Sequence, residues 1–455
     1  MNGSRNDAPR YLRRYSRRRF LQGSAAAAMA APLVLPSRIW SAETKPNSRL
    51  TMGFIGMGTQ NRGLLGGFLG QPTQVLAVCE VDTNRRNDAK RRVDEFYAQR
   101  AGYRAQCAAY NDFRELVDRK DIDAVCIATP DHWHAIPTLA ALRAGKDVYC
   151  EKPLTHNIHE AVEVIRAVDA HGRVLQTGSM QRSSKEFRVA CELVRNGAIG
   201  KVLRVECSFG DPAVPCDLPE EPMEPGLDWN MWIGPAPMRP YNSVLSPRGV
   251  HHHFPKWRAY REFGGGGVAD WGAHHLDIAQ WGLGMDDSGP VEILPPEKPG
   301  AKRGARLVYA SGVIVEHKDG FGVHFFGTEG EVLVNRGRFV FKRGNDTIAS
   351  FTGKEKKTSC AAEVQKAERE FLKDAKVRLY ESRNHLTDFL DCVASRKKPI
   401  TSEQVGGRSA ICCHLMNLVY WHGQKLRWDP ARFTFVDGTG NPAWLTRPYR
   451  SPWKV

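Results

Sequence analysis

Three residues of the chain have the types and the spacing for oxidation at an alcohol carbon. Lys152 stands between Glu151 and Pro153 at the end of a short apolar stretch, and Asp270 and His274 stand one helical turn apart. Oxidising a secondary alcohol requires an acceptor for the hydride and a base for the hydroxyl proton. A histidine, with an ordinary pKa of about 6.5, suits the base, and a lysine can donate a hydrogen bond to the same oxygen. We therefore predict Lys152, Asp270 and His274 as catalytic residues.

Two questions about these residues stay open in the sequence. Asp270, His274 and Asp277 fall at i, i+4 and i+7, so they share one helix face. There Asp270 can either orient the imidazole or bind a neighbouring substrate hydroxyl. Lys152 or His274 alone would also fit an ordinary surface position. The catalytic interpretation depends on a hydride acceptor close to them.

A glycine-rich turn near the start of the chain indicates that acceptor. Gly56, Met57 and Gly58 follow the first apolar stretch, and such a turn before a helix lets the backbone approach a dinucleotide pyrophosphate. The common G-x-G-x-x-G pattern would place its third glycine at Asn61, and the next glycine is Gly63. The turn alone is therefore a weak signal, because glycine-rich turns also occur for structural reasons.

An acidic residue about 20 positions beyond the glycines strengthens the prediction. Glu80 ends the second expected strand, where a carboxylate would bind the adenosine ribose hydroxyls and repel the 2′-phosphate of NADP. We therefore predict NAD as the cofactor, with NADP as the alternative and Asp82 as the alternative acid. Arg85 and Arg86 could meet a phosphate, but a solvated helix start is the preferred interpretation.

Short apolar stretches alternate with amphipathic helical stretches up to about residue 178. This alternation predicts a parallel sheet with helices on both faces. The expected strands are residues 50–55, 74–78, 124–128, 147–150 and 174–177, and the expected helices are residues 85–99, 135–144 and 158–170. The fold class is therefore α/β, with a Rossmann domain at residues 43–180.

The pattern changes after residue 178. A helix at residues 185–196 leads to a strand at 201–209, then to an irregular, proline-rich stretch, a glycine run and a helix at 269–282. The remaining pieces predict an α+β domain at residues 181–455. Its expected strands are residues 305–315, 320–326, 331–334 and 338–342, with turns that suggest an antiparallel sheet, and its last helices are residues 385–394 and 402–422.

With these residues the sequence closely resembles the Gfo/Idh/MocA family, which includes inositol dehydrogenases and glucose–fructose oxidoreductase. The resemblance rests on the Glu-Lys-Pro motif, on Thr129 and Pro130 followed by His134, and on the Asp-x-x-x-His-x-x-Asp helix. It implies a Rossmann domain followed by an open, mostly antiparallel sheet that also forms the contact of a homo-oligomer, a dimer or a tetramer. It also implies that Lys152 and His274 are catalytic and that the peptide bond into Pro153 is cis.

The residue chemistry and the resemblance together give two sets of site residues. The residues predicted to contact the cofactor are Gly56, Met57, Gly58, Thr59, Gln60, Glu80, Thr129, Pro130, His134, Glu151, Lys152 and Gln181. The residues predicted to contact the substrate are Lys152, Arg182, Trp257, Arg258, Asp270 and His274.

Other chemistry-bearing residues have less specific signals. The three histidines at residues 251–253 are adjacent, so they do not easily converge on one ion, and hydrogen bonding at the rim of the substrate pocket is preferred. No metal site is predicted. Asp131 marks a helix start near the nicotinamide. Trp257 can stack on a sugar or pack in the core, and the glycines at 264–267 can form a mobile loop or a simple turn.

The N-terminal residues predict export. The 455-residue chain has a net charge of +15, and much of it lies in the first 42 residues, which hold eight arginines and one acidic residue. Adjacent arginines before a short alanine-rich stretch are typical of a twin-arginine signal peptide, with a basic tail as the alternative. We expect the twin-arginine export machinery to be a partner and the periplasm, or another exported location, to be the destination. The apolar stretch is too short for stable membrane insertion.

The remaining composition argues against other classes of protein. Beyond residue 42 the positive charge is spread without a basic run, which disfavours nucleic-acid binding. Eleven cysteines without a CxxC pair indicate buried thiols and not a disulfide framework or a zinc site.

These observations predict an NAD(H)-dependent oxidoreductase that acts on a secondary alcohol of a sugar, a sugar derivative or a cyclic polyol. Because free NAD is absent outside the cytoplasm, we expect an exported enzyme to keep its cofactor bound and to pair one oxidation with one reduction. A glycosidase or lyase that works through a transient keto-sugar is the alternative. A further alternative is a binding protein without catalytic activity. Such a protein would not require Lys152 and His274, which are both present.

Overall fold

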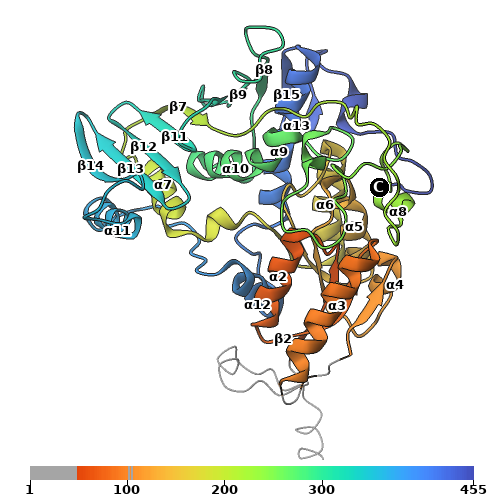
Figure 1. Cartoon of the computed structure of the whole chain (residues 1–455). Helices are drawn as coiled ribbons and strands as arrows, with labels where there is room; N and C mark the ends of the chain where they lie inside the picture. Colours follow the sequence, from red (N-terminus) through yellow and green to blue (C-terminus); the bar gives the residue numbers. More distant parts are fainter. Residues whose placement is uncertain (1–48, 101–102, 104–105) are drawn as a thin grey trace, which may run out of the picture. The chain divides into compact units, whose positions relative to one another are not determined.

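A six-stranded parallel sheet forms the first part of the described chain (Figure 1). The computed structural model describes residues 49–100, 103 and 106–455, so the predicted signal peptide lies outside the described residues. The strand order β3-β2-β1-β4-β5-β6 reverses direction between β1 and β4, which confirms the predicted Rossmann arrangement. The strands are β1 (Leu50–Ile55), β2 (Thr73–Cys79), β3 (Ala108–Tyr110), β4 (Ala124–Ile127), β5 (Asp147–Cys150) and β6 (Leu175–Thr177).

Helices cover both faces of this sheet, and each face has its own apolar cluster. Short polar side chains begin several of the helices. Asp82 accepts a hydrogen bond from the backbone N–H of Arg85 at the start of α3, and Asn157 does the same for Glu160 at the start of α6. The helices are α2 (Thr59–Leu69), α3 (Thr83–Ala98), α4 (Phe113–Val117), α5 (Ala135–Arg143) and α6 (Ile158–His171).

A ten-stranded sheet forms the second part, with the order β14-β13-β12-β11-β7-β10-β9-β8-β15-β16. Its pairings are antiparallel apart from β7 with β10, which confirms the open, mostly antiparallel sheet. The strands are β7 (Val202–Cys207), β8 (Glu292–Leu294), β9 (Arg306–Val308), β10 (Ile314–His317), β11 (Val323–Gly327), β12 (Gly330–Asn335), β13 (Arg338–Arg343), β14 (Asp346–Phe351), β15 (Leu426–Asp429) and β16 (Thr434–Phe435).

Two expected elements of this part are each divided in the structure. The single strand expected at residues 305–315 is wrong, because a turn with Gly312 at φ 84° separates β9 from β10. The helix expected at residues 269–282 is divided at Trp271 into α9 (Gly266–Asp270) and α10 (Gly272–Leu283). The other helices are α7 (Lys185–Arg195), α8 (Trp229–Ile233), α11 (Cys360–Phe371), α12 (His385–Ser395) and α13 (Glu403–His422).

Helix α13 fixes the second sheet's helices against the first sheet. An added Cβ at Gly406 would lie 2.0 Å from the hydroxyl of Thr177, so glycine is required where α13 meets β6. Farther along α13, the Ser409 hydroxyl donates to a carboxylate oxygen of Asp277 on α10 over 2.8 Å. The helix that carries His274 is thus held at a constant position relative to the Rossmann strands.

Helix α12 lies at residues that the sequence assigns to the second domain, but its side chains pack into the core of the first. Figure 1 shows α12 beside α2, and the ring of Phe389 meets Phe68 and Tyr149 edge to face at 6.2 and 5.9 Å. The two domains are therefore not continuous blocks of sequence.

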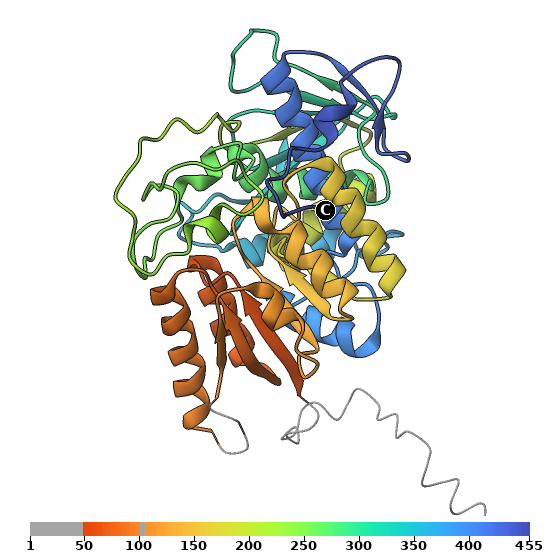
Figure 2. The ribbon, with the colours of Figure 1, turned by 90° about the vertical axis from the view of Figure 1, so that its right-hand side faces the viewer.

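An irregular segment between β7 and α9, residues 211–263, is called the insert here. It has an apolar cluster of its own, in which Trp229 and Trp232 stack at 4.7 Å. The insert, drawn in green in Figure 2, lies beside the ends of the red and orange Rossmann elements, and Thr83 N donates to its Gly226 O over 3.0 Å. Among the described helices of the chain, none is long and apolar enough to cross a bilayer.

Candidate active site

A cavity of about 410 Å³ lies at the carboxyl edge of the Rossmann sheet. Its walls come from that edge, from the insert, from α9 and α10, and from the turn after β12. This is the place where parallel α/β sheets bind ligands. The predicted site residues that line the cavity are Gly56, Gly58, Thr59, Gln60, Glu80, Thr129, Pro130, His134, Glu151, Lys152, Trp257, Arg258, Asp270 and His274.

The glycine turn after β1 has the shape that a dinucleotide requires. Gly56 has φ +80°, and an added Cβ would lie 2.9 Å from the backbone of Thr129. Beside Gly58 the space is open, and this residue begins α2 without a side-chain cap, which leaves the helix N-terminus available to a pyrophosphate. The residues present therefore fit the cofactor that the sequence predicts.

Asn61, which stands where the common motif has glycine, stabilises this turn. Its side-chain amide donates to the carbonyl oxygens of Ile55 and Gly56 over 3.1 and 2.8 Å. Gly63 does not replace the missing glycine, since an added Cβ there would meet no atom within 4 Å. In this chain the turn is therefore stabilised by hydrogen bonds from the Asn61 side chain and not by the close backbone packing that a third glycine allows.

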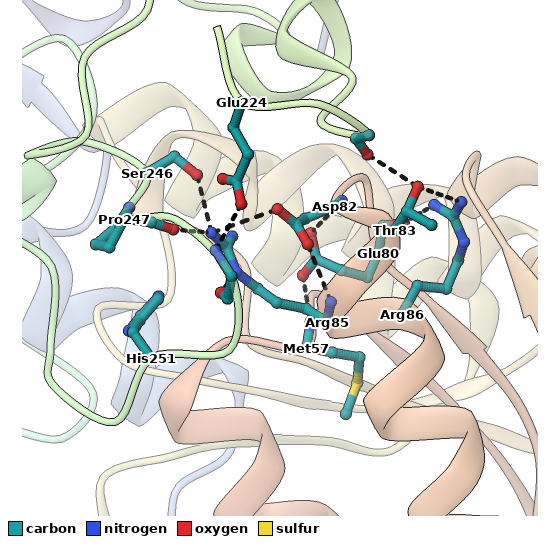
Figure 3. Close-up of polar contacts among 12 residues, drawn as sticks. Met57, Glu80, Asp82, Thr83, Arg85, Arg86, Glu224, Ser246, Pro247 and His251 are labelled. Carbon is teal, nitrogen blue, oxygen red and sulfur yellow. Dashed lines mark hydrogen bonds and ion pairs between the residues drawn. The ribbon is translucent and has the colours of Figure 1, made fainter.

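Glu80 lies at the end of the cavity where the adenosine ribose would bind (Figure 3). One carboxylate oxygen accepts from Met57 N over 2.7 Å, and the other accepts from Asp82 N over 3.0 Å. Asp82 is fully buried and caps α3, which makes Glu80 the acid that reaches the cavity. Met57 itself does not line the cavity and contributes its backbone to Glu80.

Arg85 and Arg86 are both engaged by protein acceptors. Arg85 donates to Pro247 O, to the Ser246 hydroxyl over 3.2 Å and to Gly249 O over 3.1 Å (Figure 3). Arg86 donates to Glu80 O, Thr83 and Asn111 within the Rossmann part. A 2′-phosphate would thus meet Glu80 while both neighbouring guanidinium groups are occupied, which favours NAD over NADP.

The insert is attached along this same end of the cavity. Asp228 N donates to Val81 O over 3.0 Å, and Thr83 N donates to Gly226 O over 3.0 Å. The histidine segment continues the attachment, because the Thr59 hydroxyl donates to His253 O over 2.9 Å and Arg62 donates to the carbonyl oxygen of His251.

The three histidines therefore lie over the first turn of α2, and of these His251 lines the cavity. Burial lowers the pKa of His251 to about 4, so its ring is neutral. In the described parts of the chain, no group of three or more His, Cys, Asp or Glu side chains could hold a metal ion.

Lys152 and Asp270 form an ion pair in the middle of the cavity wall. Lys152 Nζ lies 2.5 Å from Asp270 Oδ1 and 3.2 Å from the carbonyl oxygen of the same residue. Burial alone would raise the pKa of Asp270, but the charges of Lys152 and Arg258 outweigh it and the pKa falls below its ordinary value. Asp270 therefore holds the lysine and not the imidazole. The peptide bond between Lys152 and Pro153 is cis.

His274 lines the cavity with an uncharged ring. Burial, together with the positive charge of Lys152, lowers its pKa well below the ordinary value. Its Nδ1 atom is buried and has no hydrogen-bond partner among the described residues, so a bound hydroxyl can reach the ring only at Nε2. A neutral imidazole can accept a proton from a bound hydroxyl there.

The glycine run before α9 is packed and does not form a lid. An added Cβ at Gly266 would lie 2.4 Å from Ala213 N, and one at Gly267 would lie 2.3 Å from the Cα atom of Gly210. Asn417 of α13 donates to Gly265 O over 2.8 Å. The run therefore serves the close approach of backbones beside Asp270.

Arg182 and Gln181 do not line the cavity. The guanidinium of Arg182 is buried between the carboxylates of Asp277 and Asp286, with N–O distances of 2.8 and 2.7 Å. The predicted substrate contact of Arg182 is therefore replaced by a structural ion-pair network. Gln181, with its amide oriented to satisfy both neighbours, donates to His274 O and accepts from Arg336 Nε over 3.1 and 3.3 Å.

His134 lines the cavity, but both of its ring nitrogens face backbone. Nδ1 lies 2.7 Å from Pro153 O and Nε2 lies 2.9 Å from Thr129 O. Burial lowers its pKa to about 4. The neutral ring lies between the segments that follow β4 and β5 and, with its single N–H, donates to one of these two carbonyl oxygens.

Sequence reasoning missed two ionisable residues of the site. Arg336 follows β12 and lines the cavity with its guanidinium 4.8 Å from the centre of the Trp271 ring. Asp131 was expected only as a helix start, but its carboxyl lines the cavity, and burial raises its pKa to about 8. No local signal marks Arg336, because it stands in the turn between β12 and β13 and meets Trp271 from a distant part of the sequence.

Comparisons with known proteins agree with both halves of this arrangement. The model of an oxidoreductase family with an NAD-binding Rossmann fold matches residues 50–179, and that of the family's C-terminal alpha/beta domain matches residues 213–331 and 361–455. Levoglucosan dehydrogenase in complex with NADH shares the fold, with a TM-score of 0.55 and 19% identity over 83% of this chain and 99% of that chain.

Two curated relatives match shorter stretches. The chain is 29% identical over 232 residues to 1,5-anhydro-D-fructose reductase of Ensifer adhaerens, which is 50% of this chain and 59% of the relative. It is 38% identical over 102 residues to inositol 2-dehydrogenase of Rhodococcus erythropolis, which is 22% of this chain and 30% of the relative. The matches thus span 59% and 30% of the lengths of these two relatives.

Proposed function

Because the chain belongs to the Gfo/Idh/MocA oxidoreductase family, we propose that it is an NAD(H)-dependent oxidoreductase acting on a secondary alcohol of a sugar, a sugar derivative or a cyclic polyol. The observation that carries the proposal is the neutral His274 ring in the same cavity as the Lys152–Asp270 ion pair and the glycine turn. The names of the two curated relatives, a reductase and a dehydrogenase, point to the same class of substrate.

The side chains divide the reaction among them. The N-terminus of α2 binds the pyrophosphate and Glu80 accepts from the ribose hydroxyls. NAD, when bound, accepts or donates the hydride. His274 takes the hydroxyl proton at Nε2, the ring nitrogen that is not buried, and Lys152 donates a hydrogen bond to the same oxygen and stabilises the charge that develops there. Asp270 fixes the ammonium group, and in the reverse direction the same residues return the proton.

The proposal includes a cofactor that stays bound. The insert is hydrogen-bonded to Val81, Thr83 and Arg85 beside the adenosine end of the cavity. Leaving the cavity at this end requires these contacts to open. Retention suits export, which we propose from the twin-arginine pattern of residues 1–42, since exported enzyme would find no free NAD to exchange. We further propose a homo-oligomer, which chromatography with light scattering would test.

The test uses protein purified through its own export route. We expect heat denaturation to release stoichiometric NAD(H), which absorbance and mass identify, and sugars or polyols to change the absorbance of the bound nicotinamide at 340 nm. A Lys152→Ala variant should lose about 10²-fold or more of kcat/KM, while Lys201→Ala, at an exposed lysine, should not. Release of NADP would contradict the cofactor assignment. A product of elimination and not of oxidation would favour the lyase alternative.

A further inference from the structure

The substrate end of the cavity has an excess of positive charge. Lys152, Arg258 and Arg336 all line it. In the part of the chain that the structure describes, Asp270 is the single carboxylate within ion-pair distance of any of the three, at 2.5 Å from Lys152 and 3.7 Å from Arg258. One carboxylate therefore serves two cations, and Arg336 has none.

The other acids of the cavity do not remove this excess. The Asp131 carboxyl, whose pKa burial raises to about 8, is mostly protonated at pH 7. Glu151 accepts hydrogen bonds from Gln60 Nε2 and from the backbone N of Lys152, over 2.9 and 3.2 Å. Burial also raises the pKa of Glu151. With at most two ionised carboxylates against three cations, the side chains of the substrate end keep a net positive charge.

Aromatic rings fix the two arginines without using their outer N–H groups. The guanidinium carbon of Arg258 lies 4.2 Å from the ring centre of Trp257 and 5.3 Å from that of Phe254, and its Nη1 donates to Pro255 O. Arg336 lies on Trp271 and donates from Nε to Gln181. Among the described residues, Nη2 of Arg258 and both Nη atoms of Arg336 have no hydrogen-bond partner.

Arginines that serve the structure elsewhere in this chain are fully engaged. Arg182 donates to the carboxylates of Asp277 and Asp286 from all three of its nitrogens. Arg85 donates to three acceptors of the insert. Arg258 and Arg336 differ from these because their planes are held while donors remain free, which is the arrangement that binds a carboxylate in a forked geometry.

We infer that the substrate is a sugar acid, whose carboxylate binds Arg258 and Arg336 while its reacting hydroxyl lies at His274 and Lys152. This inference rests on the proposed function for the reacting hydroxyl, but the carboxylate contact is a binding property that can be measured without turnover. Trp257 and Trp271 serve in it as supports for the arginines, and Trp257 lies in the core of the insert.

The test compares two probes that differ in one group, methyl β-D-glucuronide and methyl β-D-glucoside. Binding to the NADH-loaded protein is measured by calorimetry, and turnover is followed in parallel. We expect the glucuronide to bind about 10- to 100-fold more tightly, the range that charge-assisted hydrogen bonds give. Arg336→Met should remove this preference, so that the ratio of glucuronide to glucoside affinity falls toward 1.

Arg338→Met is the matched control. Arg338 lies two residues after Arg336, stacks on Phe321 and does not line the cavity. The Arg338→Met variant should keep the preference for the glucuronide. The Arg258→Lys variant retains the positive charge but loses the forked guanidinium, so it should reduce this preference, as Arg336→Met does. Equal binding of the two probes by the wild-type protein would overturn the inference, as would tighter binding of glucose 6-phosphate than of the glucuronide. If the glucuronide binds as expected and no sugar changes the nicotinamide absorbance, the inference stands and the dehydrogenase proposal fails.

Discussion

The two ends of the cavity use arginine in opposite ways. At the adenosine end, Arg85 donates to the backbone and side chains of the insert. At the substrate end, Arg258 and Arg336 lie on aromatic rings with donors unpaired among the described residues. The first end is closed by contacts that exist without a ligand. The second end depends on a ligand to complete its hydrogen bonds, so we expect it to be where substrates enter and leave.

The largest expected effect separates the chemistry of the substrate end from cofactor binding. His274→Ala should lower kcat/KM about 10²- to 10⁴-fold, the usual contribution of a general base, while the amount of bound NAD stays the same. Because burial and Lys152 hold the pKa of His274 well below its ordinary value, the wild-type rate of oxidation should not fall between pH 7 and pH 6. His171→Ala, at an exposed histidine that ends α6, is the control. A rate that falls with protonation near pH 6.5 would contradict the role of a neutral His274.

A smaller effect is expected at the closed end. Arg85→Met removes the hydrogen bonds to residues 246–249 of the insert, so NAD should dissociate about 10-fold faster, as expected for the loss of hydrogen bonds from a charged group. Release is followed by the fluorescence of NADH after dilution into excess NAD. Arg86→Met is the matched change, because Arg86 bonds only to Glu80, Thr83 and Asn111 among the described residues. Equal dissociation from the two variants would show that the insert does not retain the cofactor.

The smallest effect concerns Asp131 and the pH dependence of stability. Its folded-state pKa of about 8 is raised by burial, whereas an unfolded chain has an aspartate pKa of about 3.9. The folded state therefore holds a proton that the unfolded state releases, and the free energy of unfolding falls as pH rises from about 4 to about 8. Asp131→Asn stays neutral, so between pH 6 and pH 8 its Tm should fall by about 2 °C less than that of the wild type. Parallel Tm curves for the two proteins would exclude the raised pKa.

Local sequence patterns predicted the elements whose signals lie within a short window. The strands β1 and β5, the glycine turn, Glu80 and the Lys152 segment are all of this kind, because a turn or a strand end places its own side chains. The three-residue strand β3 was missed. The role of Asn61 was also missed. Its side chain replaces a glycine by hydrogen bonds to Ile55 and Gly56, which no motif records.

Residues whose role depends on partners far along the chain could not be predicted. Arg182 has the sequence position of a cleft residue, but Asp277 and Asp286 on and after α10 take its guanidinium into the core. Arg336 stands in the turn between β12 and β13, and its partner in the cavity wall, Trp271, lies far from it in sequence. The sequence predicts only an irregular stretch for the insert, since its contacts with Val81 and Thr83 join residues more than 140 positions apart.

The packing of α12 and α13 determines which segments must be moved together when the Rossmann domain is exchanged between related proteins. The Rossmann sheet completes its core with Phe389 and meets Gly406 of α13, so part of its wall is supplied by the last third of the chain. A transplant that takes residues 43–180 alone would leave Phe68 and Tyr149 against water. An exchange of cofactor specificity between relatives should therefore carry residues 385–422 with the nucleotide-binding part, as one discontinuous module.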